Sequence, residues 1–92
     1  MLFFVNKADQ RVLEKLKLIG GEEEKLLLLT GDAVCFAEEA WAETLEDLEV
    51  DELFAAKDAV EARKLNVSAD CEILDYPQMV DLLFSGEKVV SV

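Results

Sequence analysis

Histidine is absent from the 92-residue sequence, and cysteine is rare. Without an imidazole there can be no Ser-His-Asp or Cys-His catalysis and no imidazole metal site. The cysteines, Cys35 and Cys71, are too far apart for a Cys-x-x-Cys motif and too few for a tetrahedral zinc centre. We therefore expect two free thiols rather than a disulfide, and the chemistry left to the chain is that of thiols and carboxylates.

Basic residues are also scarce: 9 lysines and arginines stand against 21 aspartates and glutamates, giving a net charge of −12. Proteins bind nucleic acids and anionic membranes largely through lysine and arginine, so direct binding to either is not expected. No apolar run approaches the ~20 residues that cross a bilayer. Residues 1–5 are apolar but lack the basic flank and the length of a signal peptide. We therefore expect a cytoplasmic protein.

Glycine and proline are few as well, with 4 and 1 residues, whereas hydrophobic residues make up 52% of the chain. This composition is typical of a packed globular domain, and no linker, repeat or low-complexity segment divides it. We expect a single domain over residues 1–92. The phosphate-binding patterns G-x-G-x-x-G and G-x-x-x-x-G-K-[ST] are absent, so no nucleotide or other cofactor is expected.

Short apolar runs alternate with segments in which apolar residues recur every three or four positions. The runs predict strands at residues 1–5, 25–30, 51–56, 71–74 and 88–92. Unbroken hydrophobicity is typical of parallel strands covered on both faces, and the intervening periodicity is typical of amphipathic helices. The alternation predicts an α/β fold with three α/β/α layers: a mostly parallel five-stranded sheet, helices on both faces, right-handed crossovers and the last strand at an edge.

Aspartates mark the expected helix starts, because Asp is among the best N-cap residues. They are Asp9, Asp32, Asp58 and Asp75, the last supported by Pro77 and Gln78. Asp32, Asp58 and Asp75 also lie near the carboxyl ends of expected strands. An alternative interpretation is that they form a shared acidic pocket for a divalent cation. Capping is the favoured one.

The second helix is expected to run from Asp32 to near Leu48 on one buried stripe. The stripe consists of Val34, Ala37, Trp41, Leu45 and Leu48. Phe36 falls off this stripe, so we expect it at the surface, beside the sheet's crevice or in a subunit contact. In the last helix Val80, Leu83 and Phe84 are expected to face inward.

The candidate catalytic residue is Cys35, which lies in the first turn of the helix expected after the strand at residues 25–30. Open α/β sheets bind ligands in the crevice beyond the carboxyl ends of their strands. A thiol near a helix N-terminus can have its pKa lowered, which favours the reactive thiolate. The carboxylates of Asp32, Glu38 and Glu39 would act in the opposite direction. Cys71, at the start of a strand, is interpreted as a core residue.

Several segments, in order along the chain, resemble the DsrH/TusB family of sulfur-relay proteins. They are MLFFVNK at 1–7, LLLLTGDAV at 26–34, LFAAKDAVEARKL at 53–65, ILDY at 73–76 and MVDL at 79–82. These are similar to the family's start, its leucine-rich strand with a DGV turn, its LYAL-x-x-D-x-x-ARGL segment and its DY-x-x-FVDL segment. The turn here has one extra residue and Ala33 where glycine is usual, and the family's terminal tryptophan is missing.

The resemblance implies a DsrE-like fold and assembly with two homologous partners, one DsrE/TusD-like and one DsrF/TusC-like. Such oligomers accept sulfane sulfur as a cysteine persulfide and pass it on, for 2-thiolation of the tRNA wobble uridine or in dissimilatory sulfur oxidation. The principal persulfide cysteine lies in the DsrE/TusD-like partner. Some sulfur-oxidiser members carry a cysteine near the end of the first helix, but residues 12–21 have none. Cys35 matches no family cysteine, so the resemblance carries no catalytic role over to it.

Three hypotheses follow. The first is an accessory or structural subunit of a sulfur-relay complex, not catalytic alone, which suits an acidic chain without histidine. The second is a sulfurtransferase that carries persulfide on Cys35 itself. The third is a generic oligomeric α/β interaction module without sulfur chemistry.

Overall fold

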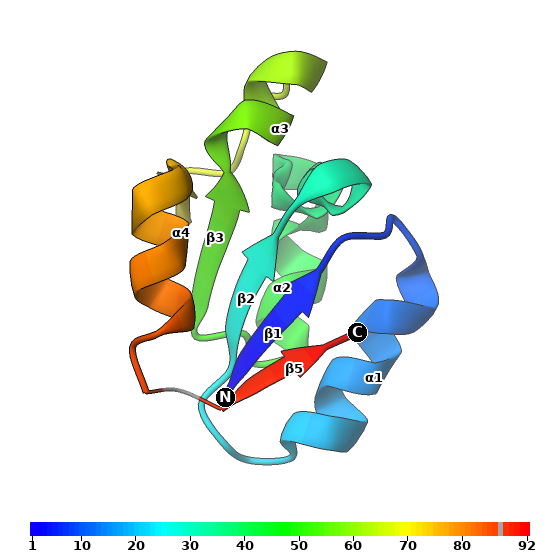
Figure 1. Cartoon of the computed structure of the whole chain (residues 1–92). Coiled ribbons are helices and arrows are strands. Elements are labelled where there is room, and N and C mark those ends of the chain that lie inside the picture. The colour runs from blue at the N-terminus through cyan, green and yellow to red at the C-terminus, as the bar shows by residue number, and fades with distance from the viewer. Residues whose placement is uncertain (87) are drawn as a thin grey trace.

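The computed structural model describes residues 1–86 and 88–92 and contains a five-stranded, all-parallel sheet flanked by helices (Figure 1). The elements are β1 (Leu2–Val5), α1 (Gln10–Gly20), β2 (Leu26–Leu29), the 3-10 helices η1 (Gly31–Ala37) and η2 (Glu39–Trp41), α2 (Ala42–Asp47), β3 (Glu52–Ala56), α3 (Lys57–Arg63), β4 (Cys71–Leu74), α4 (Tyr76–Leu83) and β5 (Val89–Ser91). The predicted α/β fold and its five strands are confirmed. No helix in the described part of the chain is long and apolar enough to cross a membrane.

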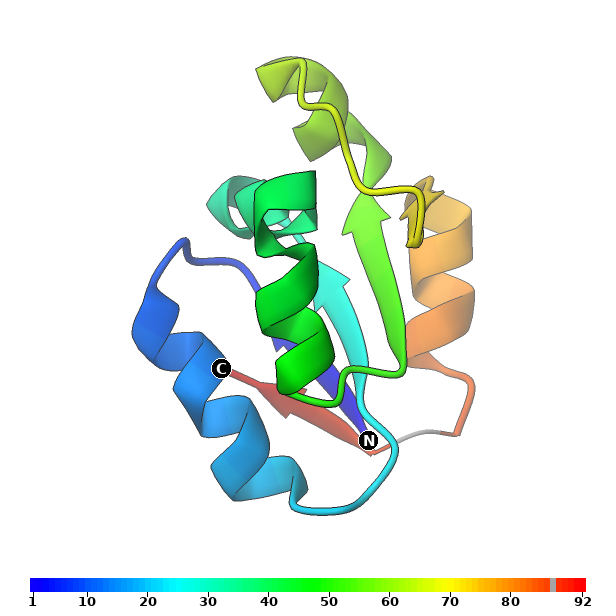
Figure 2. The ribbon, with the colours of Figure 1, turned by 180° about the vertical axis from the view of Figure 1, so that it is seen from behind.

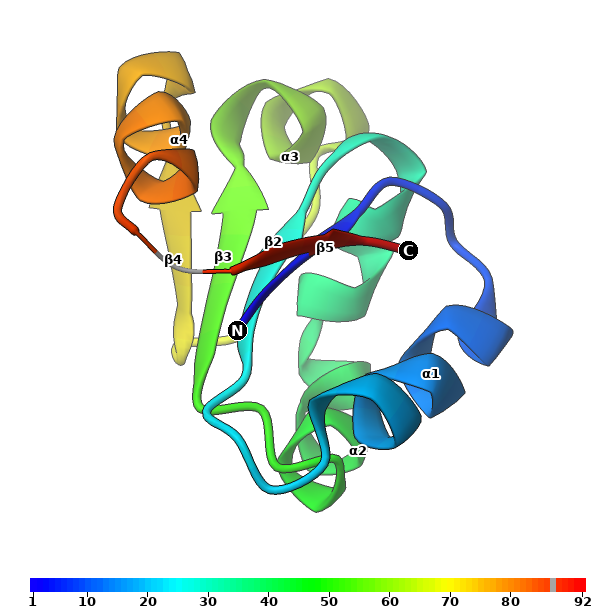
Figure 3. The ribbon, with the colours of Figure 1, turned by 60° about the horizontal axis from the view of Figure 1, so that its bottom comes forward.

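The order of the strands determines which face each helix covers. The sheet runs β4-β3-β2-β1-β5, so the chain takes three steps in one direction and then returns to pair β5 with β1 at the other edge. Because crossovers between parallel strands share one hand, a reversal of direction moves the connecting helix to the opposite face. Accordingly, α1 and α2 lie on one face and α4 on the other (Figures 2 and 3).

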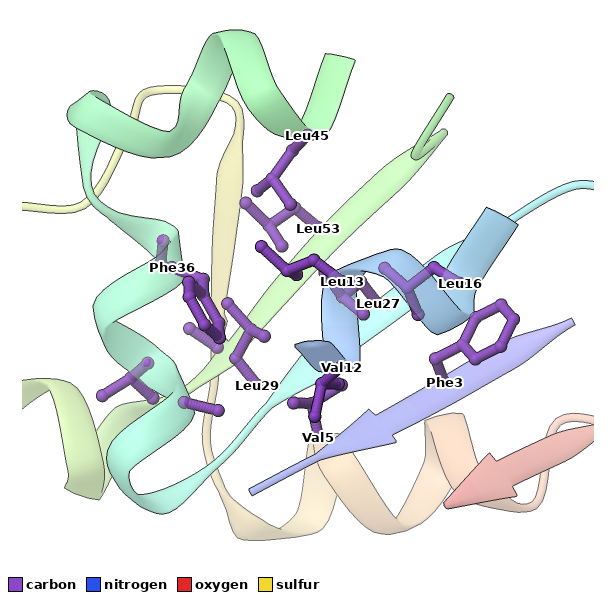
Figure 4. Close-up of a cluster of buried hydrophobic side chains, with 14 of the residues drawn as sticks. Phe3, Val5, Val12, Leu13, Leu16, Leu27, Leu29, Phe36, Leu45 and Leu53 are labelled. Atoms are coloured by element: carbon purple, nitrogen blue, oxygen red, sulfur yellow. The ribbon is translucent and has the colours of Figure 1, made fainter. Parts of the chain in front are cut away.

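The four leucines of β2 form the centre of the sheet. Each is at most 5% exposed, because β1 and β3 pair with β2 on either side and both faces are covered. Leu27 and Leu29 belong to the larger core cluster, with α1, η1 and α2, while Leu26 and Leu28 belong to a smaller cluster beneath α4. Figure 4 shows the larger cluster, where Leu13 of α1 and Leu45 of α2 meet the side chains of the sheet.

The helix expected from Asp32 to Leu48 is interrupted. After η1 the backbone is extended at Glu38 (φ −68°, ψ 153°), and η2 and α2 follow. The carbonyl of Ala37 is taken by an outside donor, the N–H of Ser68 at 2.7 Å, and Glu38 forms an isolated antiparallel bridge with Val67. Contacts from the segment before β4 therefore replace the α-helical hydrogen bonds that the sequence pattern predicts locally.

The 3-10 form also explains why the prediction for Phe36 is wrong. In a 3-10 helix residues three apart share a face, so η1 buries the pairs Ala33/Phe36 and Val34/Ala37. Phe36 is only 1% exposed and meets Trp41 edge to face, with ring centroids 4.8 Å apart. Its ring lies in the core and not in a crevice.

Two of the four predicted helix caps are confirmed. The side chain of Asp9 accepts a hydrogen bond from the N–H of Arg11. Asp75 and Gln78 form a capping box: the Asp75 carboxylate accepts from the Gln78 N–H, and the Asp75 N–H donates to the Gln78 side chain. The prediction is wrong for the second and third helices, whose N-cap positions are Thr30 and Ala56. Their aspartates lie in the first turn, where the positive end of the helix still favours a carboxylate.

The inward position predicted for Phe84 is wrong as well. The inner stripe of α4 consists of Met79, Leu82 and Leu83, which pack against the smaller cluster. Phe84 comes after the last residue of α4 and is 83% exposed.

A buried lysine ties the loops at the amino ends of β2 and β3 together. Lys25 is 1% exposed, and its Nζ donates to the carbonyl oxygen of Gly21 at 2.6 Å, just beyond α1. Its backbone N–H donates to the carboxylate of Asp51 at 2.7 Å. A Cβ at Gly20 would lie 2.9 Å from Cε of Lys25 and 3.3 Å from the Phe3 ring, so the lysine stem fills this space.

Replacing Lys25 by Met should keep the stem and remove the ammonium, leaving the Gly21 carbonyl without its donor. We expect the free energy of unfolding, measured by chemical denaturation, to fall by about 1–3 kcal/mol. The control is Lys17→Met, which changes an exposed lysine of α1 and should stay within about 0.5 kcal/mol of the parent. Equal stability of the two variants would contradict the role given to Lys25.

Candidate functional site

The thiol of Cys35 lies in η1, at the carboxyl end of the sheet as expected. This short helix contacts β2, β3 and α3. Gly31 makes the turn into it with φ +53°, a conformation that favours glycine, and a Cβ there would lie 3.3 Å from the Asn6 carbonyl oxygen. The glycine therefore lets η1 approach the end of β1 closely.

An ion pair joins η1 to α3 beside this thiol. Nη2 of Arg63 lies 2.6 Å from Oδ1 of Asp32, and Nη1 donates to the Ala59 carbonyl at 3.3 Å. The Asp32 side chain is 75% exposed, so the pair contributes about 1 kcal/mol or less to stability. Its chemical effect is to occupy the guanidinium that could otherwise stabilise a nearby anion.

The surroundings of Cys35 disfavour its thiolate. The side chain is half-buried, and burial raises the pKa of the thiol, as do the negative charges of Glu38 and Asp32. The positive charge of Arg63 opposes this only in part. Cys35 also lies in the second half of η1, away from its N-terminus. The thiol is therefore protonated at neutral pH, and a protonated thiol is a weak nucleophile.

Cys71 is in a similar condition at the start of β4. Burial, and then the charge of Glu72, raise the pKa of its thiol to about 11. It packs against the larger core cluster, in keeping with its interpretation as a core residue. Both cysteines are free thiols.

The three aspartates that follow strands do not act together. Asp32 is paired with Arg63, and Asp75 caps α4. Within residues 1–86 and 88–92, no group of three or more Cys, Asp or Glu side chains is placed to hold a metal ion. The structure therefore offers nothing in support of a shared cation pocket.

Two hollows of the described surface lie at the opposite, amino end of the sheet. One, of about 400 Å³, is lined by Ala42, Leu45, Glu46, Val50, Asp51, Leu53, Ser68 and Asp70. The other, of about 490 Å³, is lined by Glu22, Glu23, Glu24, Lys25, Glu49 and Asp51. Neither includes a cysteine. Sequence reasoning missed both, because their walls combine residues distant in the chain, such as Glu46 with Asp70.

Comparison with known proteins places this arrangement in context. The crystal structure of the YchN protein from E. coli is similar, with a TM-score of 0.70 and 16% sequence identity, over 99% of this chain and 97% of that one. At this identity the likeness shows the fold alone, and it supports the DsrE-like architecture that the resemblance implied. No curated protein matches the chain.

The family comparison is more specific. The sequence profile described as "DsrH like protein" matches residues 8–89, which includes every resembling segment except the first. A match of this length, on a fold with the expected strands, shows that the chain belongs to the DsrH-like family.

Proposed function

We propose that this protein is an accessory or structural subunit of a cytoplasmic sulfur-relay complex. The observation that carries the proposal is the DsrH-like profile match over residues 8–89. Its partners would be homologous DsrE/TusD-like and DsrF/TusC-like subunits, in an oligomer that transfers persulfide sulfur. The complex would serve 2-thiolation of the tRNA wobble uridine or sulfur oxidation.

The protonation of its thiols and its net charge favour an accessory role for this chain over a catalytic one. A persulfide carrier has to present a thiolate to its donor, and both cysteines here have raised pKa values. The net charge of −12 makes direct binding of tRNA unfavourable, so contact with an RNA-modifying machinery would pass through a partner.

Co-expression tests the proposal directly. When this chain carries the affinity tag, we expect the DsrE-like and DsrF-like subunits of the same organism to co-purify with it in a fixed stoichiometry by native mass spectrometry. An unrelated acidic α/β domain with the same tag is the control and should retain neither subunit. A chain that stays monomeric with both subunits present would contradict the proposal.

The alternative function is a sulfurtransferase that carries persulfide on Cys35. The location of this half-buried thiol at the carboxyl end of the sheet, beside Arg63, is the observation that favours it. In that reaction the Cys35 thiolate would attack the terminal sulfur of a donor persulfide and release the donor thiolate.

Intact-mass measurement after incubation with a small persulfide donor separates the two functions. Because the pKa of Cys35 is raised, we expect no adduct of about 32 Da, one sulfur atom, at pH 7. Alkylation by iodoacetamide should be slow at pH 7 and speed up by about tenfold per pH unit until the pH passes the raised pKa, since only the thiolate reacts. The matched variants are Cys35→Ser and Cys71→Ser. An adduct at pH 7 that is lost only in Cys35→Ser would establish the sulfurtransferase.

A further inference from the structure

Helix α4 is unusually apolar for an element with so little burial. With the residue that follows it, it carries six large apolar side chains, and none of them is fully buried: Tyr76, Met79, Val80, Leu82, Leu83 and Phe84. Tyr76 is 73% and Phe84 83% exposed. A helix with apolar residues over most of its circumference is typical of an element covered on more than one side.

The topology explains why this helix lacks a second cover. The return from β4 to β5 is the one crossover that reverses direction, and in the described part of the chain α4 alone lies on its face of the sheet (Figures 1 and 3). Val89 pairs in register with Leu2, which belongs to the cluster beneath α4, and is 42% exposed. Phe4, whose side chain packs against the same cluster, is only half-buried.

Apolar residues outside the inner stripe of α4 are spaced to form one surface, in which Tyr76, Phe84 and Val89 are exposed and Val80 is half-buried. Tyr76, Val80 and Phe84 follow each other at intervals of four, which places them along one side of a helix. We call Tyr76, Val80, Phe84 and Val89 the α4 surface. Large exposed apolar surfaces with polar borders are typical of sites where another protein binds.

The charges around the α4 surface indicate which partner it suits. Three exposed carboxylates lie on this side of the molecule. Asp75 caps α4 and Asp81 is part of it. Glu72 of β4 is in register with Phe54, which belongs to the cluster beneath α4. A second copy would bring the same carboxylates and another net charge of −12, and like charges facing each other across an interface are unfavourable. A less acidic chain with lysine or arginine around an apolar patch would complement both features.

We propose that the α4 surface binds a different, less acidic subunit, which places apolar side chains on Phe84 and Val89 and basic side chains opposite Glu72, Asp75 and Asp81. The inference rests on the proposed function, since that subunit is one of the homologous partners of the complex. It adds the location of the contact on this chain and the chemistry of the surface that meets it.

The test compares two almost equally exposed apolar residues on opposite faces of the sheet. Phe84→Asp places a charge in the α4 surface, and Leu18→Asp does the same on α1, where Leu18 is 85% exposed. Binding to the co-expressed partner subunits should weaken by about 30-fold or more for Phe84→Asp and by less than about threefold for Leu18→Asp. Circular dichroism checks that both variants are folded, and Tyr76→Asp replaces Phe84→Asp if the latter is not.

Each outcome has a definite meaning. Loss of binding in Phe84→Asp but not in Leu18→Asp supports the inference. A charge reversal gives a second test: Asp81→Lys should weaken binding, and replacing the facing basic residue of the partner by an acidic one should restore it. A complex that tolerates Phe84→Asp, or that Leu18→Asp disrupts, overturns the inference and leaves the proposed function intact. A homodimer of the chain alone that Phe84→Asp dissociates overturns the choice of partner. If no complex forms with the unmodified chain, the proposed function fails and this inference with it.

Discussion

The shared handedness of parallel crossovers is the constraint from which the rest of this structure follows. Three crossovers run in one direction across the sheet, and one runs back to place β5 beside β1. One face therefore receives α1, η1 and α2 and forms the larger core, while the other receives α4. The chain thus has a well-covered face, against which the two half-buried thiols pack, and a sparsely covered face with exposed aromatic side chains.

The chemistry of the thiols and the exposure of α4 favour the same interpretation. Burial and neighbouring carboxylates keep Cys35 and Cys71 protonated, so the reactive step of a sulfur relay is better placed in a partner. A small domain also has limited core to stabilise it, and apolar area covered by another subunit adds to what the core provides. Under the proposed function, this chain contributes an interaction surface to the complex, and a partner contributes the reactive thiol.

The sequence predicted what is decided locally and missed what depends on distant contacts. The strands were predictable because unbroken apolar runs such as Leu26–Leu29 have few alternatives to a doubly covered strand, and Asp75 with Gln78 is a cap formed within one turn. The break at Glu38 was not predictable, because a donor from Ser68 causes it. The buried position of Phe36 follows from the 3-10 form of η1, which ends at that break. The acidic hollows at the amino end likewise combine residues from separate segments.

Hydrogen exchange measured by mass spectrometry tests the central claim, that this chain is a subunit whose α4 face is completed by a partner. Exchange in the peptide covering α4 is compared between the free chain and the purified complex, with the peptide covering α1 as the internal reference. The account predicts that exchange in α4 slows by about tenfold or more in the complex, while exchange in α1 is unchanged. Unchanged exchange in α4, or protection confined to α1, would contradict it.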